Sequence, residues 1–213
     1  MAAEYRRHPL FAWLYAHASP AMDRGGLAAH RAGLLDGLTG SVLEVGCGNG
    51  RNFPHYPAGV TRVLAVEPDP YLRRLAVEAA RHSPVPVEVV AGAAERIAAG
   101  DGAFDAAVAS LVLCSVADPG AALREIHRVL RPGGRLRFLE HVQARTPGLR
   151  RVQRLVDAAF WPRLAGGCHT SRDTRAAIQA AGFTIERLDR FDFPPGRFPQ
   201  PATPHIQGTA TRA

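Results

Sequence analysis

Three glycines at alternate positions follow a short apolar run near residue 45. Residues 42–50 read V-L-E-V-G-C-G-N-G. The first half is β-branched and apolar, which is typical of a buried parallel strand. Glycines after such a strand let the backbone adopt positive φ, and they let a ligand approach where a Cβ would clash. The segment therefore predicts a strand that leads into a cofactor-binding loop.

The spacing of these glycines distinguishes two cofactor classes. The dinucleotide pattern G-x-G-x-x-G, begun at Gly46, needs a third glycine at position 51, where the chain has Arg51. The pattern present is E-x-G-x-G-x-G, from Glu44 to Gly50. It resembles the first motif of class I S-adenosylmethionine-dependent methyltransferases. In that family the acidic residue helps to hold the amino-acid end of the cofactor.

A second carboxylate supports this interpretation. Residues 60–67, V-T-R-V-L-A-V-E, form another apolar run, and it ends in Glu67. A carboxylate at the end of the second strand of a βαβ unit is placed to accept both hydroxyl protons of a ribose. The alternative is that Glu67 only solvates a strand end before Pro68. We expect Glu67 to bind the ribose.

The acceptor chemistry would lie nearby. Methyl transfer from a sulfonium needs an aligned nucleophile, and it needs a base only if that nucleophile arrives protonated. Ligands of this fold type bind outside the carboxyl ends of the strands. The candidates there are Ser110, Leu113, Cys114, Glu140 and His141. His141 is the expected base because imidazole titrates near neutral pH and could deprotonate a thiol of pKa about 8.5. A purely structural histidine is the alternative.

Alternating strands and helices must position these groups. Strands are expected at 41–45, 60–67, 87–90, 104–113, 135–142, 183–191 and 205–211. Helices are expected at 10–16, from Ser19 or Asp23 to about 38, and at 70–81, 119–130, 147–160 and 171–181, with a weak helix and loop at 92–100. Residues 161–170 are expected to be a loop, and 193–204 a proline-rich connection with Arg197 solvated. This alternation implies a parallel sheet with right-handed crossovers.

Composition limits the function classes. The 213 residues, with 46% hydrophobic and 21% charged, suit one domain, divided into 1–40, a cofactor-binding core at 41–142, and 143–213. The net charge is +7, but the chain contains arginine and no lysine, and the arginines are spread along the sequence. This distribution argues against a nucleic-acid partner. The three cysteines include no C-x-x-C pair, so we expect no disulfide framework, no metal site and a reducing, cytoplasmic setting. Cys168 next to His169 alone is a weak metal pair.

The N-terminal apolar run, residues 10–16, is too short for a membrane span. With Glu4 before it, we read no targeting segment. Leu10, Phe11, Leu14 and Tyr15 fall at helical spacing. We expect this face to pack onto the domain, with a lid or a membrane contact as alternatives. Arg150, Arg151 and Arg154 on a later helix are expected to be a solvated face, and a membrane interface is the alternative.

A closer resemblance extends along the chain. Its motifs are L-V-L-C-S-V at 111–116, L-R-P-G-G at 130–134, F-L-E-H-V at 138–142, G-G-C-H-T at 166–170 and P-H-I-Q-G at 204–208. Together they resemble the small methyltransferase-like subfamily, related to quinone methyltransferases, whose animal members are alkyl thiol S-methyltransferases. The resemblance implies a Rossmann-like, seven-stranded, mostly parallel sheet with helices on both faces and an antiparallel C-terminal strand. Animal members carry an N-terminal membrane anchor, and here we expect no stable membrane anchor.

The site residues follow from motif and resemblance. We expect S-adenosyl-L-methionine to be bound by Glu44, Gly46, Cys47, Gly48, Gly50, Asn52, Glu67, Pro68, Ala93, Ala94, Glu95, Ser110 and Leu111. We expect the acceptor to lie against Leu113, Cys114, His141, Trp161, Cys168 and His169. Many relatives have G-D-A-E where this chain has Gly92 to Glu95, and their aspartate accepts from the exocyclic amine of adenine. The alanine side chain at position 93 cannot accept that hydrogen bond. Adenine must then depend on backbone groups, apolar contact or Glu95.

The predicted function is methyl transfer to a small molecule, most simply to the sulfur of an apolar thiol, by a monomer or homodimer. O- or C-methylation of a phenolic, carboxylic or quinone-like metabolite is the alternative. A nicotinamide-dependent oxidoreductase is disfavoured by Arg51. A basic nucleic-acid-binding module would show salt-dependent binding to nucleic acid.

Overall fold

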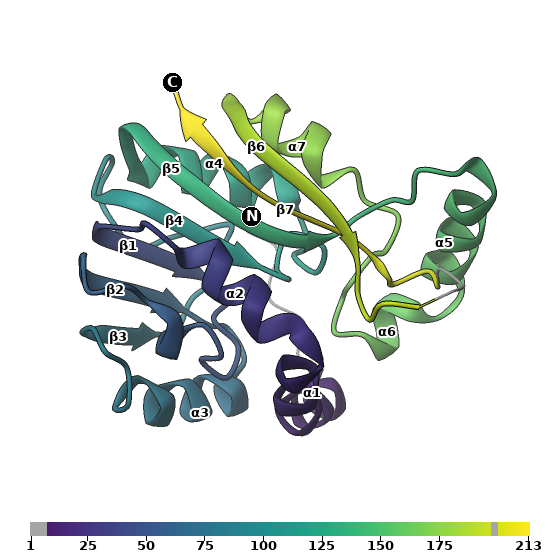
Figure 1. Cartoon of the computed structure of the whole chain (residues 1–213), viewed down its shortest axis with the longest axis horizontal. Helices are drawn as coiled ribbons and strands as arrows, with labels where there is room; N and C mark the ends of the chain where they lie inside the picture. The colour runs from purple at the N-terminus through teal and green to yellow at the C-terminus, as the bar shows by residue number, and fades with distance from the viewer. Residues whose placement is uncertain (1–7, 197–199) are drawn as a thin grey trace.

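One seven-stranded sheet runs through the molecule in the order β3-β2-β1-β4-β5-β7-β6 (Figure 1). This computed structural model describes residues 8–196 and 200–213. The strands are β1 (Gly40–Val45), β2 (Val60–Val66), β3 (Val87–Val90), β4 (Phe104–Ser110), β5 (Leu130–His141), β6 (Phe183–Asp192) and β7 (Pro204–Arg212). β1 to β5 pair in parallel, and β7 is antiparallel to both β5 and β6. The predicted fold is confirmed.

Helices cover both faces of this sheet. Leu35 of α2 and Ala76 of α3 pack in the core on one face, and Leu123 and Ile126 of α4 with Ile178 of α7 pack in the core on the other. Leu123 and Ile126 are three positions apart, so they share one side of their helix. The helices are α1 (Pro9–Met22), α2 (Ala28–Leu35), α3 (Pro70–Ala80), α4 (Pro119–Val129), α5 (Pro147–Ala159), α6 (Trp161–Leu164) and α7 (Thr174–Ala180).

Figure 1 shows α1, α5 and α6 on the side of the molecule toward which the parallel strands point. The carboxyl ends of parallel strands are where α/β proteins bind ligands. These three helices therefore border the region where a site is expected.

The N-terminal helices differ from prediction. α1 continues to Met22 and joins α2 through one wider π-helical turn, Asp23–Leu27. Asp23 does not cap a new helix, because its buried carboxylate pairs with Arg31 at 3.1 Å and Arg51 at 2.5 Å. Gly26, with φ of 120°, provides the bend between the two helices.

Two strand boundaries also differ. β4 was expected to reach Leu113 but ends at Ser110, because Leu111 has a φ of 61° and turns the chain out of the sheet. β5 was expected to begin at Arg135 but begins at Leu130, because Leu130 already pairs with Phe104 of β4. The register then shifts, and the next pair is Arg135 with Ala106.

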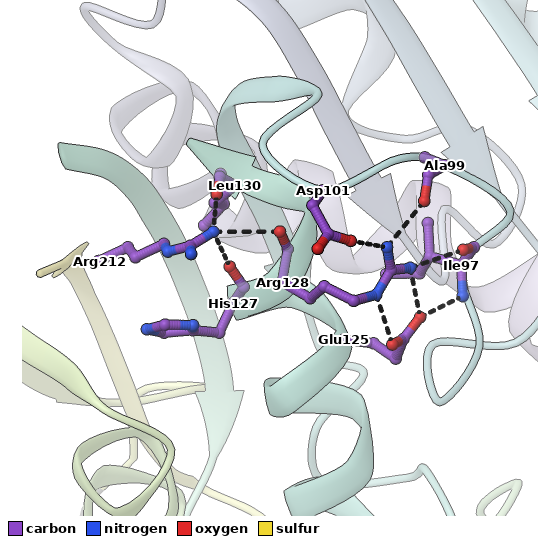
Figure 2. Close-up of polar contacts among 8 residues, drawn as sticks. All are labelled: Ile97, Ala99, Asp101, Glu125, His127, Arg128, Leu130 and Arg212. Atoms are coloured by element: carbon purple, nitrogen blue, oxygen red, sulfur yellow. Dashed lines mark hydrogen bonds and ion pairs between the residues drawn. The ribbon is translucent and has the colours of Figure 1, made fainter. Parts of the chain in front are cut away.

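The weak helix expected at 92–100 is absent; an isolated bridge joins Ala93 to Arg96 there. Arg128 of α4 binds this segment instead, donating to the carbonyls of Ala99 (2.9 Å) and Ile97 (3.1 Å) while pairing with Glu125 (Figure 2). These bonds hold the segment, which consists of turns and bends, against α4.

Figure 2 also shows how the last strand closes the fold. Arg212 of β7 donates to the carbonyls of His127 (2.8 Å), Arg128 (3.0 Å) and Leu130. The last carbonyls of a helix have no partner within the helix. Arg212 therefore satisfies the carboxyl end of α4 and joins it to the antiparallel strand.

The C-terminal part departs from prediction in two places. The expected loop at 161–170 contains the short helix α6, in which Pro162 occupies a first-turn position. The helix expected from Ser171 begins at Thr174, because the Asp173 side chain caps it by accepting from the amide of Ala176.

Arg197 and Glu4 lie outside the described residues. In the part of the chain that the structure describes, none of the helices has the length and apolarity needed to cross a membrane.

Candidate active site

A cavity of about 850 Å³ lies at the carboxyl ends of the parallel strands. Its walls come from α1, from the loops after β1 to β4, from the end of β5 and from the segment between α5 and α7. The predicted site residues that line it are Gly46, Gly48, Glu67, Pro68, Ala93, Ala94, Glu95, Ser110, Leu111, Cys114, His141, Trp161, Cys168 and His169. The predicted residues outside this wall are Glu44, Cys47, Gly50, Asn52 and Leu113.

The glycine loop has the backbone that its spacing predicts. Gly46, Gly48 and Gly50 have φ of 60°, 58° and 79°. A Cβ on Gly46 would lie 2.5 Å from Cγ2 of Val112, and a Cβ on Gly48 would lie 3.3 Å from Cε1 of Tyr15. Val112 and Tyr15 therefore leave little room for a side chain at Gly46 or Gly48.

Glu67 follows β2 and faces the cavity. Its Oε2 accepts from the amide of Gly48 at 2.8 Å, and its Oε1 accepts from the amide of Asp69 at 2.9 Å. Burial raises the pKa of Glu67 to about 7, although these two amides oppose the shift. Each carboxylate oxygen has two lone pairs, so each can still accept a hydrogen bond from a ligand.

Glu44 and Asn52 support the glycine loop without lining the cavity. The Glu44 carboxylate accepts from Asn52 Nδ2 at 2.8 Å and from the Tyr56 hydroxyl at 2.6 Å. Burial raises the pKa of Glu44 to about 7 against these two bonds. Both oxygens are thus directed into the protein, and any effect of Glu44 on a ligand passes through the loop.

Arg31 of α2 was not predicted to belong to the site. Its Nε pairs with Asp23 at 3.1 Å, and its Nη1 donates to Asn52 Oδ1 at 2.9 Å and Ser110 Oγ at 3.2 Å. Its Nη2 is buried without a hydrogen-bond partner of good geometry among the residues that the structure describes, and the Tyr15 side chain is another polar group that lies near the guanidinium. Such a nitrogen fits an anionic ligand group. In the sequence, Arg31 is one of many helical arginines, and nothing local distinguishes it.

The cavity wall formed by the segments after β2 and β3 is mostly apolar, with Pro68 and Leu72 from the first segment and Ala93 and Ala94 from the second. Glu95 accepts from the amide of Ala117 at 3.1 Å, so its carboxylate holds the loop before α4. Of the three routes considered for adenine, apolar contact is the one that this arrangement favours.

The loop after β4 is organised around Glu140, a fully buried residue of β5. The carboxylate of Glu140 accepts from the amides of Val112 (3.0 Å), Leu113 (2.9 Å) and Cys114 (3.1 Å). A non-glycine residue with positive φ, such as Leu111, is strained unless its surroundings hold it. These three bonds turn the Leu113 side chain into the core, which corrects its predicted place in the acceptor pocket.

Two cysteines and one histidine meet at the cavity wall. His141 Nδ1 lies 3.6 Å from Sγ of Cys114 and 3.6 Å from Sγ of Cys168. Cys114 follows β4 and Cys168 follows α6, so residues far apart in sequence form this cluster. The hydrogen bond between the thiols raises the pKa of Cys114 and lowers that of Cys168. Burial opposes ionisation of His141, but contact with Cys114 outweighs it and raises its pKa.

His205 of β7 lies behind this cluster, with ring centroids 4.3 Å from His141. Burial, together with the charge of His141, lowers the pKa of His205 to about 3. His205 is therefore neutral near pH 7, and it fixes the position of the His141 ring by packing.

The segment from α6 to α7 forms the far wall. His169 donates its amide to the Cys114 carbonyl at 2.8 Å, and Arg172 donates to the Leu113 carbonyl at 2.6 Å. Asp157 of α5 accepts from the amides of Thr170 and Ser171, at 2.9 Å each. These bonds join the loop after β4 to the C-terminal segment. The sequence contains no local pattern from which this join could be predicted.

α1 forms the remaining wall with Phe11 and Tyr15. Tyr15 contacts Gly48, and a Cβ on Gly166 would overlap with the Phe11 ring. α1 also exposes Leu10 (67%), Trp13 (50%) and Leu14 (47%), and Leu14 borders the cavity. The predicted packing of the apolar face is therefore correct only in part, because Phe11 and Tyr15 are half-buried in the cavity wall while Leu10 and Leu14 are exposed.

Comparison with known proteins agrees with this arrangement. The methyltransferase domain family matches residues 43–138, which span β1 to most of β5. The human thiol S-methyltransferase TMT1B is 36% identical over 186 residues, covering 84% of this chain and 75% of the relative. The chain belongs to the class I S-adenosylmethionine-dependent methyltransferases, in the thiol methyltransferase subfamily.

A second relative supports the same family, and a solved structure supports the fold. The human thiol S-methyltransferase TMT1A is 37% identical over 176 residues, covering 81% of this chain and 70% of that relative. The fold of this methyltransferase also matches a SAM-dependent methyltransferase from Thermotoga maritima, with a TM-score of 0.70 at 18% identity, covering 97% of this chain and 99% of that one. At that identity the structural match speaks for the fold alone.

Proposed function

We propose that this methyltransferase transfers the methyl group of S-adenosyl-L-methionine to the sulfur of a small, mostly apolar thiol. One observation carries the proposal: a single cavity is lined both by the glycine loop with Glu67 and by the cluster of Cys114, His141 and Cys168. The names of the relatives support a thiol as the acceptor.

The residues present fit the cofactor. Gly46 and Gly48 line the cavity with the positive φ that glycine adopts readily, and Glu67 retains lone pairs for the two ribose hydroxyls. The unpaired Arg31 Nη2 suits the carboxylate of the amino-acid end. The cofactor supplies an activated methyl group, so the protein has no leaving group to protonate.

The acceptor side would hold a thiol against Trp161, Cys168 and His169, with His141 making or holding its thiolate. As the new S–C bond forms with an electron pair of the acceptor sulfur, the methyl–sulfonium bond breaks and its pair stays on the departing sulfur. The contribution of the protein is alignment of the two sulfur atoms, an effect worth up to several kcal/mol of barrier.

The setting is part of the proposal. All three cysteines are unpaired and buried, which suits a reducing compartment such as the cytoplasm. A monomer or homodimer without a stable membrane anchor or nucleic-acid partner would be enough for this chemistry.

Calorimetry with S-adenosylhomocysteine followed by an acceptor panel tests the proposal. The panel pairs an alkyl thiol with the alcohol of the same carbon skeleton, and adds a phenol and a carboxylic acid. We expect cofactor binding, no binding of NADH, and product only from the thiol. Methylation of the phenol or the acid and of no thiol would refute the acceptor class.

His141→Asn separates the two halves of the site. It should keep the affinity for S-adenosylhomocysteine and lose thiol methylation. His127→Asn is the matched control, because His127 packs edge-on against Phe183 and lies outside the cavity wall. Equal activity of the two variants would remove His141 from the proposal.

A further inference from the structure

We infer that Cys114, His141 and Cys168 form a zinc site whose fourth position receives the acceptor thiol. The inference rests on the proposed thiol methylation and specifies how the thiolate is made. The three ligand atoms lie within 4.8 Å of one another, and all three residues line the cavity.

The contacts of His141 call for a shared partner. Its Nδ1 lies 3.6 Å from both sulfurs, yet one imidazole nitrogen has either one proton or one lone pair. It cannot make a full hydrogen bond to two thiols at once. A cation at the centre of the three atoms would satisfy all of them.

The spacing suits zinc. Bonds of about 2.3 Å to sulfur and about 2.0 to 2.1 Å to nitrogen put sulfur and nitrogen about 3.6 Å apart, and two sulfurs about 3.8 Å apart, in a tetrahedral site. Both observed S···N distances equal the first value. The sulfurs, at most 4.8 Å apart, would need to close by about 1 Å at most to reach the second.

The ligands are held before any ion binds. Glu140 fixes the amide of Cys114, the amide of His169 next to Cys168 binds the Cys114 carbonyl, and His205 packs against His141. Three ligands from three separate elements therefore converge without rearrangement of the backbone. Such preorganisation reduces the ordering cost of binding a metal.

Charge balance also suits a divalent cation. Two thiolates and a neutral imidazole cancel the charge of Zn²⁺. The charged groups near the cluster are Glu140, Asp157 and Arg172, and Arg172 is held by the Leu113 carbonyl and His169. The neutral metal site can thus stay in a mostly buried position beside Arg172.

The open position explains the chemistry. Two Cys and one His as ligands, with the fourth position open, is the arrangement of a catalytic rather than a structural zinc. A thiol that coordinates zinc is deprotonated. Its proton would leave to water in the cavity, its sulfur would keep the electron pair that forms the S–C bond, and the neutral thioether would then dissociate from the zinc. His141 would serve as a ligand and not as the base.

The test uses the full chain, kept reduced with a phosphine. Elemental analysis should find one zinc per chain. Cobalt replacement of the metal should give the intense visible bands of a tetrahedral thiolate complex, and an alkyl thiol should shift those bands while its matched alcohol should not.

Cys114→Ser and Cys168→Ser should lose the cobalt bands, while Cys47→Ser, the third cysteine, should keep them. Retained affinity for S-adenosylhomocysteine shows that Cys114→Ser and Cys168→Ser are folded, and circular dichroism shows the same for Cys47→Ser. Chelation should abolish thiol methylation, and zinc should restore it. Metal-free protein that methylates thiols at full rate would overturn the zinc site and leave the proposed function intact. Metal-loaded protein that methylates only non-thiol acceptors would instead refute the proposed function.

Discussion

Cofactor binding should release a proton from Glu67. In the free protein the pKa of Glu67 is about 7, because the carboxyl group is buried. Hydrogen bonds to a charged group are worth about 1.5 to 3 kcal/mol, and 1.36 kcal/mol corresponds to about one pKa unit. Two ribose hydroxyls that donate to the carboxylate should therefore lower this pKa by two units or more.

The magnitude follows from linkage. A group that titrates near 7 when free and near 5 when bound makes affinity rise about tenfold between pH 6 and pH 8, and binding at pH 7 releases about half a proton. The sign is set by the bound state, which favours the ionised carboxylate. Among the charged groups near Glu67, Asp69 raises its pKa and Arg73 lowers it, so these two contributions oppose each other.

The assay is calorimetry with S-adenosylhomocysteine at pH 6, 7 and 8, each in two buffers of different ionisation enthalpy. Glu67→Gln should remove the coupling to pH. Glu44→Gln is the matched control, since Glu44 has the same raised pKa but lies outside the cavity wall, and it should keep the coupling. Proton release that is absent in the parent protein, or equal in the parent and Glu67→Gln, would refute the assignment of Glu67 to the ribose.

Three further substitutions test the rest of the site. Gly48→Val should abolish cofactor binding, because the φ of Gly48 is 58° and the valine side chain would press on Tyr15. Circular dichroism should show that the fold is retained. Unchanged affinity for S-adenosylhomocysteine would contradict the glycine-loop assignment. Arg31→Met should lower the free energy of unfolding in urea by about 3 kcal/mol, because it breaks the buried pair with Asp23, and should also weaken cofactor binding. An effect on stability alone would exclude Arg31 from the cofactor site. Glu140→Gln replaces one accepting oxygen by an NH2 group, which then faces a backbone N–H that it cannot bind. This variant should lose about 1 to 3 kcal/mol of stability. It should also raise the acceptor KM while the affinity for S-adenosylhomocysteine stays unchanged. An unchanged KM would show that this loop does not shape the acceptor pocket.

The elements could be predicted where local sequence decides the structure. β1 and the glycine loop follow from an apolar run and from glycines whose φ only glycine adopts readily. The end of β4 could not be predicted, because Leu111 adopts positive φ only through bonds that Glu140 makes from another strand. That contact is tertiary, and no pattern around Leu111 reports it.

The same distinction holds for the site. Glu67 was placed correctly at the cavity, because its position at a strand end is a local property. The convergence of Cys114 and Cys168 on His141 depends on how the segment after α6 packs against the loop after β4. Arg31 was missed for the same reason, since its importance lies in partners that come from three other parts of the chain.

α1 limits how this enzyme could be redesigned for new acceptors. Tyr15 touches the cofactor loop at Gly48, and Phe11, one helical turn earlier, touches the acceptor wall at Gly166. A substitution that reshapes the acceptor pocket from α1 would therefore also disturb the hold on the cofactor, so selection for a new substrate would work against catalysis. Trp161 lines the same cavity from α6, a different element from α1 and from the glycine loop. Acceptor preference can be varied there with the cofactor half unchanged, which makes the α5–α6 region the better starting point for a library of variants.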